Sequence, residues 1–156
     1  MVTRGFSLAL AFLRIAAGLS LLMLGLQKLG WFANPPLDQK FAAWSAHPAN
    51  VLVAKYLDFV TPHHSVLARL VVLGELTLGA LLIAGFLTPL AGLLAFFMVA
   101  NFQFAGSAMF SLDYLRNPGG LSYLLVFPLL FFGRAGTALG VDGLIARRRQ
   151  SATPAT

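Results

Sequence analysis

Glu75 is an acidic residue in the middle of an apolar run, and its carboxylate is therefore the first candidate for chemistry. The run extends from Leu70 to Leu87, and the next charged residue after Glu75 is Asp113. A charged side chain is costly in the middle of a bilayer, so such a residue usually pairs with another group or takes part in ion or proton movement. We therefore expect Glu75 to act in proton transfer.

Arg14 and Asn101 are the polar residues that the apolar pattern places at a depth similar to that of Glu75. With a rise of 1.5 Å per residue, Arg14 lies about 12 Å and Asn101 about 16 Å from one membrane face, while Glu75 lies about 15 Å from the other. The sequence predicts an Arg14–Glu75 ion pair completed by Asn101. This group would tune proton transfer by Glu75 or only hold the helices together.

A second set of candidates lies near the opposite ends of the first two apolar segments. Lys28 and Arg69 would attract an anion or the carbonyl oxygens of a quinone, and we assign Gln27 and Trp44 to the same substrate or quinone site. The alternative is that these long side chains only extend to the membrane interface, as basic residues commonly do.

The sequence offers little for metal or haem chemistry. There is no cysteine, and the three histidines are His47, His63 and His64, none of them inside an apolar segment. A catalytic zinc ion usually needs three protein ligands in a defined geometry, which the adjacent His63 and His64 do not suggest. We therefore predict neither metal nor haem, and a redox reaction would need a quinone as co-substrate or a partner subunit.

The composition indicates an integral membrane protein. Of the 156 residues, 58% are apolar and 10% are charged, whereas soluble domains carry about 25% charged residues. A span needs roughly 20 residues, which limits the chain to about four spans. The net charge of +6 does not indicate nucleic-acid binding, because its one cluster, Arg147 to Arg149, follows the last apolar segment, where basic residues mark the cytoplasmic side.

The predicted fold is an all-α integral membrane protein, a four-transmembrane-helix bundle. Spans are expected at residues 6–29, 65–87, 90–110 and 119–132. Gly18 and Gly25 would let another helix approach closely, or reflect the ordinary glycine content of membrane helices. An external interfacial subdomain of short helices is predicted between the first two spans, at residues 31–64. Residues 1–150 form one domain, and residues 151–156 are expected to be a disordered tail.

The distribution of basic residues predicts the orientation. Arg4, Arg134 and Arg147 to Arg149 fall on one side, whereas Lys40, Lys55 and Arg116 fall on the other, together with acidic residues. Because basic residues concentrate in cytoplasmic segments, both termini are expected in the cytoplasm.

Several motifs resemble the DoxX/DoxD family in their order and spacing. They are Leu13-Arg14 with Gly18, Gly25-Leu-Gln-Lys28-Leu29, Gly74-Glu75-Leu76 with Gly79, Gly85 and Thr88, Asn101-Phe-Gln-Phe-Ala-Gly106, and Gly133-Arg134-Ala-Gly136 through Gly140-Val-Asp142 to Arg147. The resemblance covers nearly the whole chain and implies a multi-pass protein of a bacterial or archaeal plasma membrane. It also marks Arg14, Lys28, Glu75 and Asn101 as polar positions typical of the family.

The resemblance implies a membrane subunit of a quinone-linked oxidoreductase, with thiosulfate or a related sulfur anion as electron donor. One branch of the family is the small subunit of a thiosulfate:quinone oxidoreductase, which works with a DoxA-type subunit. No DoxA-like region follows the last span, so that partner would be a separate chain. The alternative is a non-enzymatic accessory or assembly subunit that docks a partner protein, and a homo-oligomer is also open.

Overall fold

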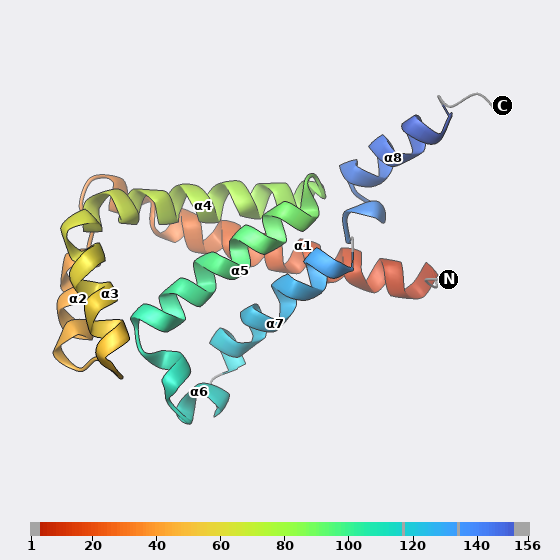
Figure 1. Cartoon of the computed structure of the whole chain (residues 1–156). Helices are drawn as coiled ribbons and strands as arrows, with labels where there is room; N and C mark the ends of the chain where they lie inside the picture. The colour runs from red at the N-terminus through yellow and green to blue at the C-terminus, as the bar shows by residue number, and fades with distance from the viewer. Residues whose placement is uncertain (1–3, 117, 134, 152–156) are drawn as a thin grey trace.

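The computed structural model describes residues 4–116, 118–133 and 135–151, and this part of the chain is helical and contains no strand (Figure 1). The all-helical class predicted from the sequence is therefore confirmed. In chain order the elements are α1 (Arg4–Gln27), η1 (Leu29–Phe32), α2 (Leu37–Ala46), α3 (Val51–Val60), η2 (Thr61–His63), α4 (His64–Ala84), α5 (Thr88–Ala105), η3 (Ala108–Phe110), α6 (Asp113–Arg116), α7 (Pro118–Phe132), η4 (Ala135–Thr137) and α8 (Val141–Ser151).

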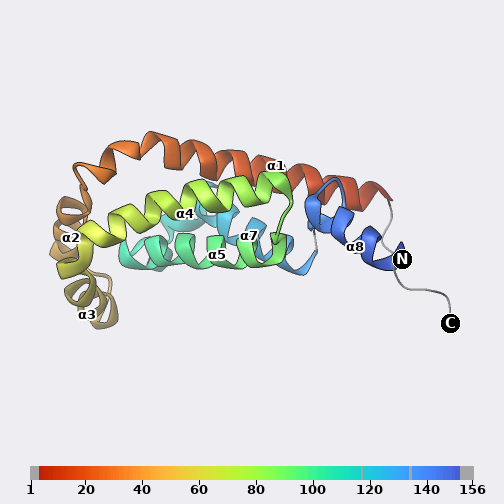
Figure 2. The ribbon, with the colours of Figure 1, turned by 90° about the horizontal axis from the view of Figure 1, so that it is seen from above.

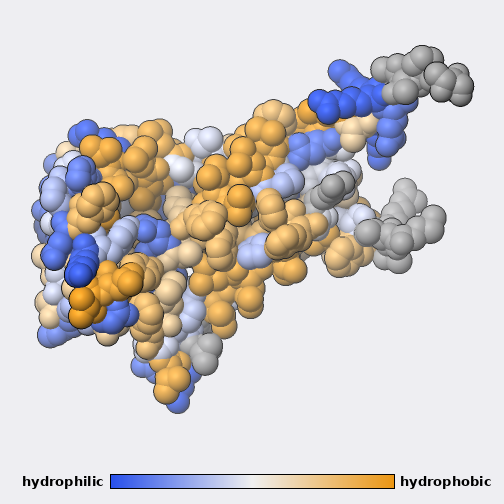
Figure 3. Space-filling model, viewed as in Figure 1, coloured by the Kyte–Doolittle hydropathy of each residue, from blue (hydrophilic) through white to orange (hydrophobic). Residues whose placement is uncertain are grey.

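Three helical stretches of the described chain are long and apolar enough to cross a membrane: Gly5–Gln27, Val51–Ala84 and Thr88–Ala105. The fourth apolar helix, α7, has 15 residues, which corresponds to about 22 Å of helix, whereas the hydrocarbon core is about 30 Å thick. The surface has a hydrophobic band along the helices and hydrophilic regions at both ends (Figure 3). The protein is thus a membrane protein, and the fourth complete span stays a prediction.

The long helices pack in neighbouring pairs: α1 lies against α4, α4 against α5, and α5 against α7 (Figures 1 and 2). The largest buried cluster joins all four, through Leu10, Ala17, Leu21, Leu78, Leu82, Ala91, Ala95, Phe127, Leu130 and, from η4, Ala135. These side chains are apolar, so within this cluster helix association depends on close packing.

Glycines bring α1 and α4 into close contact. A Cβ atom on Gly79 would lie 2.7 Å from the Leu22 backbone nitrogen and 2.9 Å from the Gly18 carbonyl oxygen, and one on Gly18 would lie 2.9 Å from the Gly79 carbonyl oxygen. Neither backbone can give way without moving the whole helix. The close-approach interpretation of Gly18 is therefore correct, and Gly79 is its counterpart in α4.

Gly79→Ala is expected to destabilise the protein by about 1–3 kcal/mol, because the added methyl group must push α1 away from α4. The matched control is Gly74→Ala in the same helix, where the Cβ atom would meet only the flexible Met98 side chain, at 3.2 Å from its sulfur. Thermal unfolding in a mild detergent should show a lower Tm for Gly79→Ala than for Gly74→Ala. Equal Tm values would contradict the close crossing at Gly79.

At one end of the bundle, α2 and α3 lie across the ends of α4 and α5 (Figures 1 and 2). We call this the α2–α3 end. Its buried cluster combines residues of all four helices: Leu37, Phe41, Val53, Leu57, Val60, Ala68 and Ala105. The Asn50 side chain begins α3 by accepting hydrogen bonds from the backbone nitrogens of Leu52 and Val53, both 3.0 Å long, which is the usual capping arrangement. The short helices predicted in 31–64 are thus present as a packed layer.

At the other end, which we call the α8 end, α4 turns into α5 and α8 begins. Gly85 ends α4 in the left-handed conformation, with φ of 66°, and a Cβ atom there would collide with the Arg14 guanidinium. The final helix extends to Ser151, so this residue belongs to α8 and not to the predicted disordered tail. Residues 152–156 lie outside the described residues.

Candidate functional site

Glu75 lies in the middle of α4 and is buried, with 4% of its surface exposed. Its Oε1 atom accepts a hydrogen bond from the Lys28 ammonium, and the two groups form an ion pair. Its Oε2 atom is also buried and has no hydrogen-bond partner among the described residues. One carboxylate oxygen is therefore held by Lys28 and the other is available to a further donor.

Lys28 connects the buried carboxylate to the α2–α3 end. It follows the last residue of α1, and 23% of its side chain is exposed. Its Nζ atom lies 5.4 Å from the centroid of the Trp31 ring, within the range of a cation–π interaction. Trp31 in turn packs against the buried cluster of the α2–α3 end. Glu75, Lys28 and Trp31 therefore form a series of side-chain contacts from the middle of α4 to the α2–α3 end.

The predicted Arg14–Glu75 pair is wrong, because α1 and α4 are offset along their axes. The first turns of α1 project beyond the end of α4 (Figure 1), and Arg14 lies beside Gly85. Glu75 is ten residues from Gly85 in the sequence, so it lies about 15 Å along the helix from Arg14. Because α1 and α4 do not begin and end at the same level (Figure 1), residues at equal distances from their helix ends do not meet.

Arg14 instead holds the chain segment that leads into α8. The side chain is fully buried. Its Nη1 atom donates to the carbonyl oxygens of Ala135 and Ala138, at 3.0 and 3.3 Å, and its Nη2 atom donates to that of Leu139, at 3.0 Å. A guanidinium presents several donors in a fixed plane, which suits it to collect three carbonyl oxygens. The contacts assign Arg14 a structural role.

Asp142 completes the same connection at the start of α8. Its carboxylate accepts hydrogen bonds from the backbone nitrogens of Leu87 and Thr88, at 2.9 and 3.0 Å, and its own backbone nitrogen donates to the Gly85 carbonyl at 2.9 Å. Leu87 is the N-cap residue of α5 and has no capping side chain of its own. Asp142 therefore caps α5 from another helix.

Asn101 also lies away from Glu75. Its Oδ1 atom accepts a hydrogen bond from the Tyr56 hydroxyl, which joins α5 to α3. Asn101 is exposed and borders an open groove of about 480 Å³ lined by Phe97, Ala100, Asn101, Phe104 and Met109. The expected completion of an Arg14–Glu75 pair by Asn101 is thus wrong, because both of its presumed partners face other groups.

The other residues predicted to form a substrate or quinone site with Lys28 do not gather around it. Gln27 and Arg69 are exposed, and no hydrogen bond or ion pair within the described chain joins either of them to Lys28. Trp44 is half-buried between α2 and α5, with its ring centroid 5.8 Å from that of Phe41 and 6.4 Å from that of Phe102. Of the four residues assigned to a substrate or quinone site, Lys28 is the one that forms a hydrogen bond and an ion pair with Glu75.

The spacing of small and polar residues along α1 and α4 contains a signal against the Arg14–Glu75 pair. One face of α1 repeats at alternating steps of four and three residues through Arg14, Gly18, Leu21, Gly25 and Lys28, and one face of α4 does so through Ala68, Val72, Glu75, Gly79 and Leu82. Such spacing keeps a stripe of residues on the side that faces a partner helix. Aligning the two stripes in antiparallel order at Gly18 and Gly79 places Leu21 opposite Glu75 and Arg14 opposite Leu82, near the end of α4.

The described residues contain no group of three or more His, Asp or Glu side chains that could hold a metal ion. The absence of metal and haem stays a prediction. Arg134, one of the basic residues used to predict the orientation, lies outside the described residues, and the cytoplasmic placement of both termini also stays a prediction.

The fold and the site define a helical membrane protein in which a lysine at the end of the first long helix pairs with a buried glutamate in the next. The family model DoxX matches residues 9–108, which include Arg14, Lys28, Glu75 and Asn101. The protein belongs to the DoxX family. Comparison with curated proteins and with solved structures gives no match.

Proposed function

We propose that the protein is the membrane subunit of a quinone-linked oxidoreductase and that the Lys28–Glu75 pair exchanges protons with the quinone. The observation that carries this proposal is the buried Glu75 carboxylate, whose Oε2 atom has no partner in the described chain while Oε1 is bonded to Lys28. Ionisable residues inside a membrane commonly take part in proton pathways. Membership of the DoxX family supports the link to redox chemistry.

Reduction of a quinone to a quinol takes two electrons and two protons. In the proposed reaction the Lys28 ammonium gives a proton to the Glu75 carboxylate, and Glu75 passes it to a quinone oxygen as that oxygen gains negative charge. The partly exposed Lys28 then takes up a proton from water at the α2–α3 end, and the cycle runs twice for each quinol formed. The electrons come from a sulfur anion such as thiosulfate and are delivered by a separate DoxA-type partner subunit. Arg14 and Asn101 have no part in proton transfer here, because their contacts lie elsewhere.

Glu75→Gln is expected to slow thiosulfate-dependent quinone reduction by about 100-fold or more, because glutamine keeps the shape of the side chain but cannot transfer the proton. The assay uses decylubiquinone and membranes that contain the full chain and its partner. The control is Asp38→Asn, which removes an exposed carboxylate in α2 and should leave the rate unchanged.

Binding of decylubiquinone to the purified chain provides a second measurement that does not depend on the electron donor. Trp31 lies next to Lys28, so a bound quinone should quench tryptophan fluorescence, and Lys28→Met should weaken the quenching. If Glu75→Gln and Lys28→Met both leave quinone binding and quinone reduction unchanged, the proposed site is wrong.

A non-enzymatic accessory subunit is the second candidate function, and the Asn101 groove favours it. Asn101, which is bonded to Tyr56, borders an open and otherwise apolar groove, and polar residues can join helices of different chains in a membrane. Purification in mild detergent separates the two candidates. A stoichiometric partner that is lost in Asn101→Leu, without quinone binding, would support the accessory subunit.

A further inference from the structure

The α8 end combines a groove with a cluster of basic side chains that the proposed redox function does not use. The groove has a volume of about 380 Å³, and its lining includes Ala84 at the end of α4, Val141 and Leu144 of α8, and Arg147. Arg148 and Arg149 follow directly, and the only acidic residue of α8 is Asp142. The Asp142 carboxylate accepts two backbone hydrogen bonds and so faces the α4–α5 turn.

Apolar side chains are exposed beside these arginines. Leu139 is 75% exposed and Leu144 is 60% exposed, and Val141 and Ile145 are each 37% exposed. Figure 1 shows α8 leaving the end of the bundle obliquely, next to the ends of α4 and α1. The α8 end thus places apolar surface next to the membrane-spanning helices and positive charge farther along the same helix, so that the apolar part can contact lipid chains and the arginines can reach the headgroups.

The start of α8 is held in a defined place. Asp142 joins it to the α4–α5 turn, and Arg14 holds the preceding carbonyl oxygens. The arginines therefore extend from an anchored helix and not from a loose tail. An anchored cluster of this kind can hold one ligand in a fixed position, because little conformational freedom is lost on binding.

We propose that the α8 end is a binding site for an anionic phospholipid. The phosphate of the lipid interacts with Arg147 and its basic neighbours, and one acyl chain lies in the groove against Ala84 and Leu144. Charge complementarity identifies the occupant: a cluster of arginines attracts an anionic headgroup, and the apolar lining beside it suits a hydrocarbon chain. The proposal is independent of the redox function and of which side of the membrane the α8 end faces.

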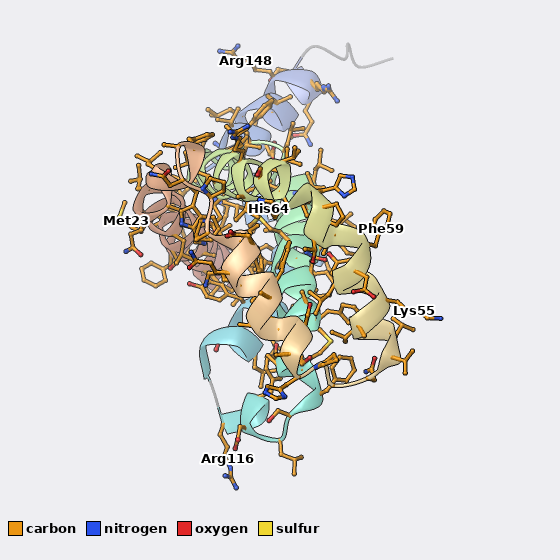
Figure 4. The ribbon with its side chains drawn as sticks, turned by 90° about the vertical axis from the view of Figure 1, so that its left-hand side faces the viewer. Met23, Lys55, Phe59, His64, Arg116 and Arg148 are labelled. Atoms are coloured by element: carbon orange, nitrogen blue, oxygen red, sulfur yellow. The ribbon has the colours of Figure 1, made fainter. Side chains whose placement is uncertain are left out.

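The test measures binding of fluorescent phosphatidylglycerol and phosphatidylcholine to the full chain in dodecyl maltoside. The wild-type chain is expected to prefer phosphatidylglycerol by about 10-fold or more, since each basic residue adds to attraction for an anionic headgroup. The triple variant Arg147→Gln, Arg148→Gln, Arg149→Gln should lose this preference. The matched control is Lys40→Gln, Lys55→Gln, Arg116→Gln, which removes the same charge from exposed positions elsewhere; Arg148, Lys55 and Arg116 all project away from the helices in Figure 4.

Two further experiments distinguish a lipid site from a site for a free anion and from general attraction between charges. Ala84→Phe fills the groove without altering charge, and it should weaken binding of phosphatidylglycerol while the arginines remain. Inorganic phosphate at matched concentration should not displace the lipid. The proposal is overturned if the control triple variant loses the preference equally, if Ala84→Phe binds like the wild type, or if inorganic phosphate displaces the lipid and thereby defines a site for a free anion.

Discussion

Lys28→Met is expected to destabilise the protein by about 3–5 kcal/mol, because it leaves the buried Glu75 carboxylate without its charged partner. Methionine keeps the length and the apolar part of the lysine side chain, so loss of packing contributes little. Thermal unfolding in a mild detergent, followed by tryptophan fluorescence, measures the change. Lys40→Met is the control, since Lys40 is exposed on α2 and its replacement should alter the stability by about 0.5 kcal/mol or less.

The double variant Lys28→Met, Glu75→Leu tests whether the loss of stability in Lys28→Met comes from the unpaired Glu75 carboxylate. It removes both charges from an apolar environment, and such a replacement is often neutral or stabilising. The double variant should therefore be more stable than Lys28→Met alone. Measured together with the single variant Glu75→Leu, the three changes in stability give the coupling energy of the pair. If the two single changes are simply additive, Lys28 and Glu75 do not interact and the proposed site does not exist.

Comparison of stability and function in these variants separates the two roles of the pair. A stable double variant that no longer binds quinone would indicate that the pair serves function more than folding. A double variant that binds quinone as the wild type does would indicate that the pair only joins α1 to α4.

Arg14→Met is expected to cost about 3–5 kcal/mol, because it leaves the carbonyl oxygens of Ala135, Ala138 and Leu139 without their donor in a buried region. Arg14→Lys should recover only part of this, since an ammonium group cannot match the planar arrangement of guanidinium donors. The control is Arg69→Met, because Arg69 is exposed on α4.

Hydrogen exchange gives a local measurement for Arg14→Met. The Asp142 backbone amide is bonded to the Gly85 carbonyl, and it should exchange faster when the neighbouring segment loosens. The Lys28–Glu75 pair lies about ten helical residues away, or roughly 15 Å, so amides beside Glu75 should change less. Equal protection of the Asp142 amide in Arg14→Met and in the wild type would show that Arg14 does not hold the α8 end.

The helical elements followed closely from the sequence. Helix α1 spans Arg4–Gln27 where residues 6–29 were expected, and α4 spans His64–Ala84 where 65–87 were expected. These boundaries depend on local features, such as the apolar run of α4 and the glycine that ends it, and local features can be recognised along the chain. The Asn50 side chain that caps α3 is a local feature of the same kind.

The hydrogen-bond partners of the polar residues could not be predicted from local sequence features. Arg14, Glu75 and Asn101 belong to three separate sets of contacts. Pairing depends on the relative shift of two helices along their axes, and a shift of one turn moves every side chain by about 5.4 Å. Counting residues from the helix ends gives the depth of each residue in its own helix, but not the displacement of one helix along the other.

By itself the sequence determined that this chain is a helical membrane protein with a glutamate inside its least polar segment, because composition and periodicity show which segments require a lipid environment. The order of its motifs, which the DoxX model matches, determined the family. Only the tertiary structure decided that Lys28 pairs with Glu75 and that Arg14 instead anchors the α8 end. The physical reason is the close crossing at Gly18 and Gly79, which sets the offset between α1 and α4 and places Arg14 beside Gly85 and not beside Glu75.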